Sequence, residues 1–521
     1  MSQKNVRGRA TAIVVQWWWV VAIIVLALLL RLYGLTNASI WSDEGFSLTL
    51  ITYPLRSIWA LSGRDVHPPL YYVMLHGWME LIAGKSLAWA RGLSVLFGTL
   101  SVALGMWLAL LISTRRAAVI AGLLYALLPI AVYYSQDVRM YAMLGTWLVG
   151  ATIALVYWVN RPQKWGYLVT YAVLMVFGLY THYFSIFCLC SHWLYLLLIR
   201  LPRYGGHTYV GRKEWWLANG VMVACFIPWL PSLLSQLSTA DSNWVAPISI
   251  YSFPSAIGRF FTGNDGQAHG AGIFWLLLFA YLALAVQVLL KPAGQYRFPL
   301  LLVICAFFTP CAAAGISVFR PVFVERYMFF SALMMPLVIA LALENIRSGG
   351  RIVALVVLLG IETYGLHNIY NQRPSLNDPS RVADNQLARL MAYFNEASIT
   401  GDVLVVSDVF IFYAADFYSE KPRRIVMHTP LPKNGGPQHP DGMGFTAAMA
   451  RFANDTYIDD IADLAPKTRR VWVLSFSSQA SESIGVPARW RLILHKRGGD
   501  NQLNLYVMCS PQTPDLSEIC E

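Results

Sequence analysis

Residues 13–30 read IVVQWWWVVAIIVLALLL, and a basic residue, Arg31, follows directly. A helix of about 20 residues crosses the ~30 Å hydrocarbon core of a bilayer, because it rises about 1.5 Å per residue. Comparable apolar runs recur along the chain as far as Tyr370 and then stop. The sequence therefore predicts a polytopic, α-helical membrane protein whose backbone hydrogen bonds are made inside its helices.

The composition agrees with this interpretation. The 521-residue chain is 57% hydrophobic and 13% charged, and its mean hydropathy is +0.50, so it has too little polar surface to cover a soluble globule. The net charge of +11 could suggest nucleic acid. However, Lys and Arg occur in small clusters between the apolar runs, which is the positive-inside pattern of membrane proteins. We therefore expect membrane lipid and no nucleic acid as a partner.

The first apolar run begins like a signal peptide, because Lys4, Arg7 and Arg9 precede it. The run is long, however, and reaches Arg31 without a small-residue cleavage site. We expect a retained first helix that begins in the cytoplasm and runs outward.

The segment His67 to Gly84 admits two interpretations. It begins near a proline pair and carries His76 and Glu80, so it is a weak spanning segment. If it spans, Arg115, Arg116 and later basic clusters fall outside; if it lies along the outer interface, they fall inside, which we prefer. With the first helix, the remaining predicted spans make about eleven: 88–112, 117–134, 140–159, 166–181, 184–199, 215–234, 271–290, 298–317, 328–343 and 352–370.

The spans define a membrane-embedded domain, residues 1–371, and leave residues 372–521 as a soluble extracytoplasmic domain of a multi-pass protein, which we expect in a bacterial inner or plasma membrane. The tail alternates β-rich runs with helix-like stretches such as Phe445 to Ala453, which indicates an α/β fold. The spacing of its two cysteines, Cys509 and Cys520, permits a disulfide, and two free thiols are the alternative. The β-rich runs are 403–406, 424–427, 471–474, 490–494 and 503–507.

Two short motifs follow the first helix. In Trp41-Ser-Asp43-Glu44-Gly, a carboxylate at the membrane surface could act as a general base, although the same residues could simply open a helix. In Asp65-Val-His67-Pro-Pro-Leu, the prolines favour an extended entry into a helix whose N-terminus, with His67, could meet an anion. An ordinary interfacial turn explains this second motif equally well.

Two arginine motifs are predicted on the same outer face. In Ser-Gln-Asp137-Val-Arg139-Met-Tyr, the arginine lies where a loop re-enters the membrane, a place where a charge is either functional or paired with the nearby aspartate. In Arg320-Pro-Val-Phe-Val-Glu-Arg326-Tyr, a second arginine site follows a later span. Two arginines and a histidine could neutralise a phosphate. A turn at His182-Tyr183 is a weaker candidate.

The order of these motifs resembles the GT-C superfamily of membrane glycosyltransferases, specifically family 39-type enzymes such as the protein O-mannosyltransferases and the lipid A aminoarabinose transferases. The resemblance rests on Asp-Glu, Asp-x-His-Pro-Pro-Leu, Ser-Gln-x-x-Arg-Met-Tyr-Ala and Arg-Pro-x-x-x-x-Arg-Tyr, and it covers roughly Trp17 to Tyr370. Asp-Glu together with His-Pro-Pro-Leu is fairly specific, whereas each motif alone is weak. The tail carries no part of the resemblance.

The resemblance implies roles for particular residues. Asp43 would be the base or acceptor-orienting carboxylate, and Glu44 would assist it. His67 stands near the place where the aminoarabinose transferases have a lysine that contacts the donor phosphate, and Arg139 and Arg326 correspond to arginines near that phosphate. The secondary candidates are Asp137, Tyr141, His182, Arg320 and Tyr327.

The expected reaction is transfer of a sugar from a polyprenyl-phosphate donor to a hydroxyl of a glycan, lipid or protein acceptor, on the extracytoplasmic face and with inversion. No cofactor is expected, and a requirement for a divalent metal ion is left as an open alternative. Three alternatives remain: a transporter or flippase, which would have ionisable residues near mid-membrane and broken helices; a polysaccharide polymerase; and an inactive scaffold.

Overall fold

The structure is a computed structural model, and main-chain contacts divide the chain into two compact units, each described by itself. The helical unit comprises Met1–Leu35, His67–Met74 and Leu87–Asn377, and the mixed unit comprises Thr36–Val66, Leu75–Ser86 and Asp378–Glu521. The predicted boundary between residues 371 and 372 stays a prediction. The structure describes residues 3–82, 86–239, 245–263, 271–291, 296–372, 386–420, 424–429, 444, 446, 457–464, 470–478, 485–488 and 490–508.

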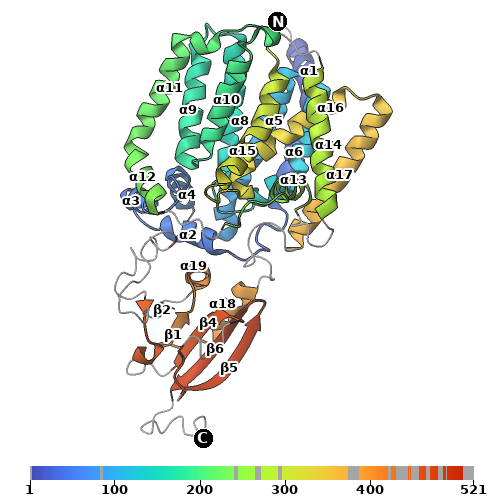
Figure 1. The fold of residues 1–521 in the computed structure, drawn as a ribbon. Helices are drawn as coiled ribbons and strands as arrows, with labels where there is room; N and C mark the ends of the chain where they lie inside the picture. Colours follow the sequence, from blue (N-terminus) through green and yellow to red (C-terminus); the bar gives the residue numbers. More distant parts are fainter. Residues whose placement is uncertain are drawn as a thin grey trace. The chain divides into compact units, whose positions relative to one another are not determined.

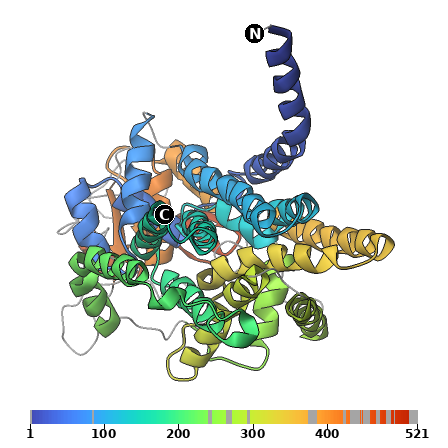
Figure 2. The same cartoon turned by 90° about the horizontal axis from the view of Figure 1, so that it is seen from above.

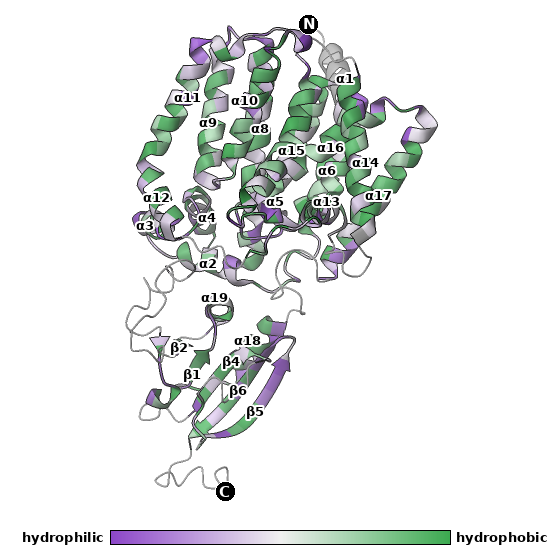
Figure 3. Ribbon diagram, in the orientation of Figure 1, coloured by the Kyte–Doolittle hydropathy of each residue, from purple (hydrophilic) through white to green (hydrophobic). Residues whose placement is uncertain are grey.

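The helical unit is a bundle of long apolar helices (Figures 1 and 2). Colouring by hydropathy shows mostly apolar residues along the helices and polar residues near many of their ends (Figure 3). Its helices are α1 (Gln3–Leu32), α5 (Leu87–Ile112), α6 (Arg115–Leu127), α7 (Pro129–Ser135), α8 (Tyr141–Asn160), α9 (Trp165–Thr181), α10 (Ser185–Leu198), α11 (Lys213–Phe226), α12 (Leu230–Thr239), α13 (Ser252–Thr262), α14 (Ala271–Leu290), α15 (Phe298–Ser317), α16 (Phe329–Glu344) and α17 (Ser348–Tyr370), with short 3₁₀ turns η1 (Pro202–Tyr204), η2 (Tyr209–Gly211), η3 (Ile227–Trp229) and η4 (Glu325–Met328).

Burial separates central helices from peripheral ones. The apolar window of the span Glu325–Glu344, which contains α16, is 89% buried, and that of α8 is 83% buried. The corresponding windows of Lys213–Thr239 and of α17 are only 17% and 22% buried. Because these outer helices are apolar on their exposed faces as well, their natural surroundings are lipid tails.

The described residues contain seven helices long and apolar enough to cross a membrane, or eight if the bent pair α6 and α7 forms one span. The chain is therefore a multi-pass membrane protein, but the predicted count of about eleven spans is not confirmed. Three further apolar helices coincide with predicted spans and are shorter, namely Trp17–Leu32, α9 and α10. A helix of about 16 residues rises only ~24 Å, less than the bilayer core, so length alone does not establish that these three span.

The predicted span 117–134 is broken. α6 ends at Leu127, α7 begins at Pro129, and the two helices meet at an angle of 57°. Pro129 lacks the N–H that would bond four residues back, so an uninterrupted helix is disfavoured at this position. The break turns α7 and the residues after it into a corner that leads to α8.

The described part of the predicted segment, residues 67–82, contains one short helix, α4 (Leu70–Glu80). Main-chain contacts assign this helix to the helical unit as far as Met74 and to the mixed unit from Leu75. Eleven residues rise only about 16 Å, so α4 is too short to cross a bilayer. This length agrees with the interfacial interpretation, and the side of the membrane on which α4 lies stays a prediction.

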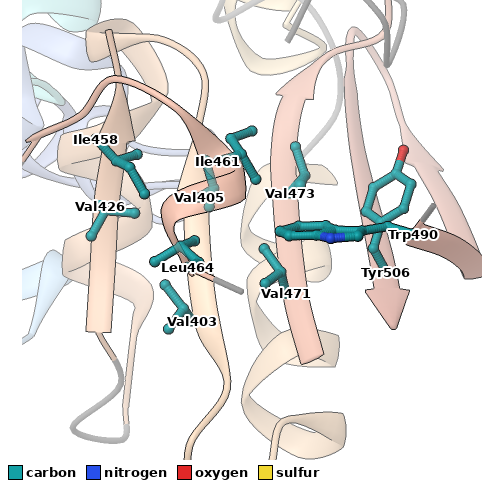
Figure 4. Packing of buried hydrophobic residues seen from close by; sticks show 10 residues of the cluster. All are labelled: Val403, Val405, Val426, Ile458, Ile461, Leu464, Val471, Val473, Trp490 and Tyr506. Carbon is teal, nitrogen blue, oxygen red and sulfur yellow. The ribbon is translucent and has the colours of Figure 1, made fainter. Parts of the chain in front are cut away.

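The mixed unit contains a six-stranded sheet in the order β3-β2-β1-β4-β6-β5, in which β1 to β4 are parallel and β5 and β6 form an antiparallel edge. One core cluster packs across the strands against η6 (Figure 4). The unit's elements are α2 (Ser42–Leu50), α3 (Leu55–Gly63), α18 (Gln386–Ala397), β1 (Val403–Val406), α19 (Val409–Tyr418), β2 (Arg424–His428), β3 (Tyr457–Ile458), η6 (Ile461–Leu464), β4 (Arg470–Phe476), β5 (Trp490–Gly498) and β6 (Asn501–Met508).

The α/β prediction for the tail is confirmed. All five predicted β-rich runs are strands, and the sequence missed the two-residue strand β3 and the helices α18 and α19. The predicted helix Phe445 to Ala453 falls almost entirely outside the described residues, and so do Cys509 and Cys520.

Candidate functional site

The corner between α7 and α8 places Arg139 inside the helical unit. Arg139 lies in the short turn that follows α7, and only 2% of its surface is exposed. The hydroxyl of Ser94, on α5, donates to the backbone oxygen of Arg139 at 3.3 Å. The neighbouring Asp137 is fully buried. Because buried charges persist only where other groups balance them, this corner is a strong candidate for a site.

The Arg139 guanidinium contacts two residues of the segment that begins at His67. Its Nη2 lies 3.4 Å from Nδ1 of His67, and its Nη1 lies 3.5 Å from the hydroxyl of Tyr72. An arginine can only donate, so Nδ1 of His67 is the acceptor and the proton of the neutral ring sits on Nε2. His67 therefore presents an N–H donor on the side of the ring away from Arg139.

His182 has the same tautomer. The backbone N–H of Phe184 donates to its Nδ1 at 3.1 Å, so Nε2 of the neutral ring carries the proton. The centre of the His182 ring lies 5.4 Å from that of His67, 6.0 Å from that of Tyr141 and 5.1 Å from that of Tyr327. The turn after α9 therefore brings a second imidazole donor beside the first.

Burial and the nearby arginines keep both histidines neutral. Burial is the largest cause that lowers the pKa of His182, to about 3, and the charges of Arg139 and Arg326 lower it further. The pKa of His67 is also lowered well below its usual value, first by burial and then by Arg139, His182 and Arg326. Both rings are thus uncharged donors at neutral pH, and the local positive charge comes from the arginines.

Arg326 acts on these rings from the turn η4. Its guanidinium carbon lies 5.6 Å from the centre of the Tyr327 ring. The adjacent carboxylate, Glu325, forms a salt bridge with Arg259 of α13. We call His67, Arg139, His182 and Arg326 the cationic cluster.

The other sequence candidates have different positions. Tyr141 begins α8 and is fully buried, with its ring centre 4.6 Å from that of Tyr134. Arg320 is directed to α12, where its Nη1 donates to the backbone oxygen of Leu237 at 3.4 Å. The structure thus brings His67, Arg139, His182 and Arg326 together, with Tyr141 and Tyr327 as ring neighbours of His182, whereas the described bond of Arg320 leads elsewhere.

Asp43 and Glu44 belong to the mixed unit. The N-cap of α2 is Trp41, which makes no side-chain cap bond, so both carboxylates lie in the first helical turn, where the helix dipole favours negative charge. Glu44 is fully buried, whereas Asp43 is partly exposed. A Cβ at Gly45 would lie 2.6 Å from Cβ of Tyr413, so α2 packs closely on α19 at the residue after the two carboxylates.

Tyr72 is a site residue that the sequence did not single out, because tyrosines near a membrane surface are typical of interfacial belts. It is fully buried, and its hydroxyl contacts Arg139. Among the described residues, no group of three or more His, Cys, Asp or Glu side chains is arranged to hold a metal ion. The cluster instead offers two guanidinium groups and two imidazole N–H groups, which are donors that suit an anion.

Solved structures of two transferases have a similar fold. The chain has the fold of ArnT from Cupriavidus metallidurans, with a TM-score of 0.62 and 15% identity over 96% of this chain and 100% of that one. The form of ArnT bound to undecaprenyl phosphate gives 0.61 at 14% identity, over 94% and 98% of the two chains.

A second membrane transferase has a similar fold. The Archaeoglobus fulgidus oligosaccharyltransferase matches with a TM-score of 0.54 and 15% identity, over 88% of this chain and 68% of that one. The GT-C resemblance inferred from the motifs is thus confirmed at the level of the fold. No protein-family profile matches the sequence, and no curated protein matches it.

Proposed function

We propose that this protein is a membrane glycosyltransferase that moves a sugar from a polyprenyl-phosphate donor to an acceptor hydroxyl on the extracytoplasmic face, with inversion at the anomeric carbon. The observation that carries the proposal is the cationic cluster. Two arginines and two neutral histidines that each carry an N–H at Nε2 match the oxygens of a phosphate better than they match a neutral sugar.

An apolar hollow of about 310 Å³ has a lining residue that is adjacent in sequence to a member of the cluster. It is lined by residues of α9 to α12, including Met222 and Phe226, and by Tyr183, which directly follows His182. A phosphate site beside an apolar hollow suits an amphiphilic donor, whose head is anionic and whose tail is hydrocarbon. We infer that the polyprenyl chain begins in this hollow.

The fold supports the same donor class. ArnT has been crystallised with undecaprenyl phosphate, and the archaeal oligosaccharyltransferase AglB, with a TM-score of 0.52 and 13% identity, in a complex with a dolichol-phosphate. At these identities the likeness concerns the fold. The donor class is therefore proposed on the cluster and on the fold together.

The proposed step is a single displacement. Asp43 accepts the proton of the acceptor hydroxyl as its oxygen attacks the anomeric carbon, and Glu44 assists in orienting that carboxylate. The bond between the anomeric carbon and the phosphate oxygen breaks, and its electron pair leaves with the polyprenyl phosphate. The phosphate gains one negative charge in this step, and Arg139 and Arg326 stabilise it as it forms.

A transporter is the strongest alternative. The break between α6 and α7 is a feature that transporters use, and Glu362 of α17 is a fully buried carboxylate within a membrane helix. In transporters, however, the carbonyls freed by a break coordinate the cargo ion. Here two of them, in Tyr125 and Ala126, accept hydrogen bonds from Arg31, so the break favours a structural role.

The decisive experiment follows the donor itself. Purified protein in detergent is incubated with a panel of polyprenyl-phosphate sugars and an extract of envelope acceptors, and release of polyprenyl phosphate is measured. Release that needs the acceptor supports the transferase. No release from any donor, together with movement of the intact donor across the bilayer of a proteoliposome, would instead support a flippase.

A further inference from the structure

Arg31, near the end of α1, is a fully buried arginine that lies outside the cationic cluster. Its guanidinium reaches both halves of the broken helix, α6 and α7. Four hydrogen bonds hold it: Nη1 donates to the backbone oxygens of Ala27 at 3.0 Å and Ala126 at 3.2 Å, Nη2 to that of Tyr125 at 3.5 Å, and Nε to the hydroxyl of Ser135 at 3.2 Å.

The break in the helix explains why a guanidinium is needed at this place. In an unbroken helix, the oxygen of Tyr125 would accept from residue 129, but Pro129 has no N–H to give. Backbone oxygens without donors are costly inside a membrane bundle. Arg31 supplies donors to both Tyr125 and Ala126, and its positive charge suits the C-terminal end of α6.

The far end of α7 is fixed to the same residue. The Ser135 hydroxyl, which accepts from Arg31, itself donates to the backbone oxygen of Ala131 at 2.6 Å. The amide of the next residue, Gln136, donates to the backbone oxygens of Arg31 at 2.9 Å and Tyr33 at 2.7 Å. The C-terminal ends of α6 and α7 are therefore both attached to the end of α1.

These bonds end three residues before Arg139. We propose that Arg31 is a positioning residue for the donor-phosphate site, because it holds the bend between α6 and α7 and so sets the place of the turn that carries Arg139. The inference rests on the proposed function, since it concerns the same phosphate site. The four hydrogen bonds of Arg31 all go to groups outside the cluster.

The test compares binding of polyprenyl phosphate to the full-length protein in detergent for a set of variants. Arg31→Met keeps much of the side-chain volume and removes all four hydrogen bonds, so binding should weaken by roughly tenfold or more, the scale of one misplaced charge-assisted hydrogen bond. Arg31→Lys keeps the charge but not the planar fork, and should bind with an intermediate affinity. Thr152→Val, which removes a buried hydroxyl bonded to Leu148 and His192, is the matched control and should bind as the wild type does.

A double variant separates positioning from general destabilisation. If Arg31 acts through Arg139, Arg31→Met in an Arg139→Ala background should cause no further loss of affinity, whereas an unrelated structural defect would add to it. If Arg31→Met does not fold, Ser135→Ala removes one of the four bonds and should weaken binding in the same direction, by less. Full affinity in the folded Arg31→Met protein would overturn the inference, and so would full affinity in Ser135→Ala where Arg31→Met does not fold. Fully additive losses in the double variant would overturn it as well. Failure of the wild type and of Thr152→Val to bind polyprenyl phosphate would instead refute the proposed donor.

Discussion

Nη2 of Arg139 lies 3.4 Å from Nδ1 of His67, although 72 residues separate them in the sequence. Because the guanidinium can only donate, this contact fixes the tautomer of His67 and points its Nε2–H away from the arginine. The N–H of His67 is therefore directed to the side of the ring opposite Arg139. The pair therefore connects the turn after α7 to the segment that begins at His67.

Removing either arginine of the cluster should weaken donor binding. Arg139→Ala and Arg326→Ala should each raise the dissociation constant for polyprenyl phosphate by about 10- to 100-fold, the scale of a charge-assisted hydrogen bond. Titration of the detergent-solubilised variants measures this, and a better acceptor should not restore the loss. Arg320→Ala is the contrast in the same loop, because its side chain is bonded to Leu237, and its affinity should stay near that of the wild type. An equal loss in all three variants would indicate a general charge effect and not a site.

The stability of the protein should fall as the solution is acidified. His182 has a pKa of about 3 in the folded protein, mainly because of burial, against about 6.5 in an unfolded chain. Between these values the unfolded chain binds more protons than the folded one. The free energy of unfolding therefore decreases as the pH falls through this window. The melting temperature should therefore decrease between about pH 7 and about pH 5.

The histidine can be separated from other titrating groups by substitution. His182→Gln removes the titrating ring, so its melting temperature should depend less steeply on pH than that of the wild type. Tyr327→Phe, which keeps a ring 5.1 Å away in place, should retain the wild-type slope. Parallel slopes in His182→Gln and the wild type would show that His182 does not cause the dependence.

Close packing between α5 and α7 should make one glycine of α5 sensitive and another tolerant. A Cβ at Gly98 would lie 1.9 Å from the hydroxyl of Ser135 and 3.2 Å from Nε of Arg31. Gly98→Ala should therefore cost about 1–3 kcal/mol, as overpacking of a tight interior does. At Gly105 the nearest atom is 3.6 Å away, so Gly105→Ala should be neutral or stabilise the helix by up to about 1 kcal/mol. Melting in detergent compares the two, and equal costs would refute the close contact.

The helices could be predicted from the sequence because each apolar run is long and contains few charges. Every predicted span coincides with a helix or with a run of helical segments. The number of helices that cross the membrane was predicted less well. Helices such as α10, with 14 residues, are apolar enough but short, and hydropathy does not distinguish a tilted span from a helix that stops inside the bundle. The bend at Pro129 was also missed, since Pro is tolerated in membrane helices.

The site was predictable only where a charge interrupted an apolar pattern. Arg139 and His67 stood out for this reason, and the structure brings them together. Arg31 did not stand out, because a basic residue at the end of an apolar run is what the positive-inside pattern also produces. The Tyr72 hydroxyl contacts Nη1 of Arg139. This contact depends on how the chain folds, so the sequence pattern alone did not indicate it.

The membrane topology leads to a separate prediction. If the positive-inside pattern holds, Arg203, in a basic loop, should lie in the cytoplasm, and Asp43, Arg139 and the tail should lie outside. Single cysteines introduced near these positions, in a background without the native cysteines, should react with a membrane-impermeant maleimide from opposite sides of oriented vesicles. Labelling of the residues beside Arg139 from the cytoplasmic side would rule out the proposed outer-face site.

The catalytic prediction concerns Asp43, the partly exposed carboxylate in the first turn of α2. Asp43→Asn keeps the size and most of the hydrogen-bonding capacity of the side chain but removes its ability to accept a proton. Turnover should therefore fall by roughly 10²–10⁴, the usual scale for loss of a general base. Binding of polyprenyl phosphate should not change, because the proposed phosphate ligands belong to the cluster.

The control for Asp43→Asn is Glu80→Gln, which neutralises another carboxylate of the mixed unit. The Glu80 side chain is 69% exposed, and its Oε1 lies 3.2 Å from Nε2 of His76. Removing the charge of such an exposed carboxylate should cost little stability. The Glu80→Gln variant should also keep a turnover near that of the wild type. Both proteins are first shown to be folded by melting, and release of polyprenyl phosphate is then measured at saturating donor and acceptor. Near-normal turnover in Asp43→Asn would remove this residue from the mechanism. The proton acceptor would then have to be sought at Glu44 or Asp137, and because both are fully buried, either one would need a movement of the chain to meet an acceptor hydroxyl.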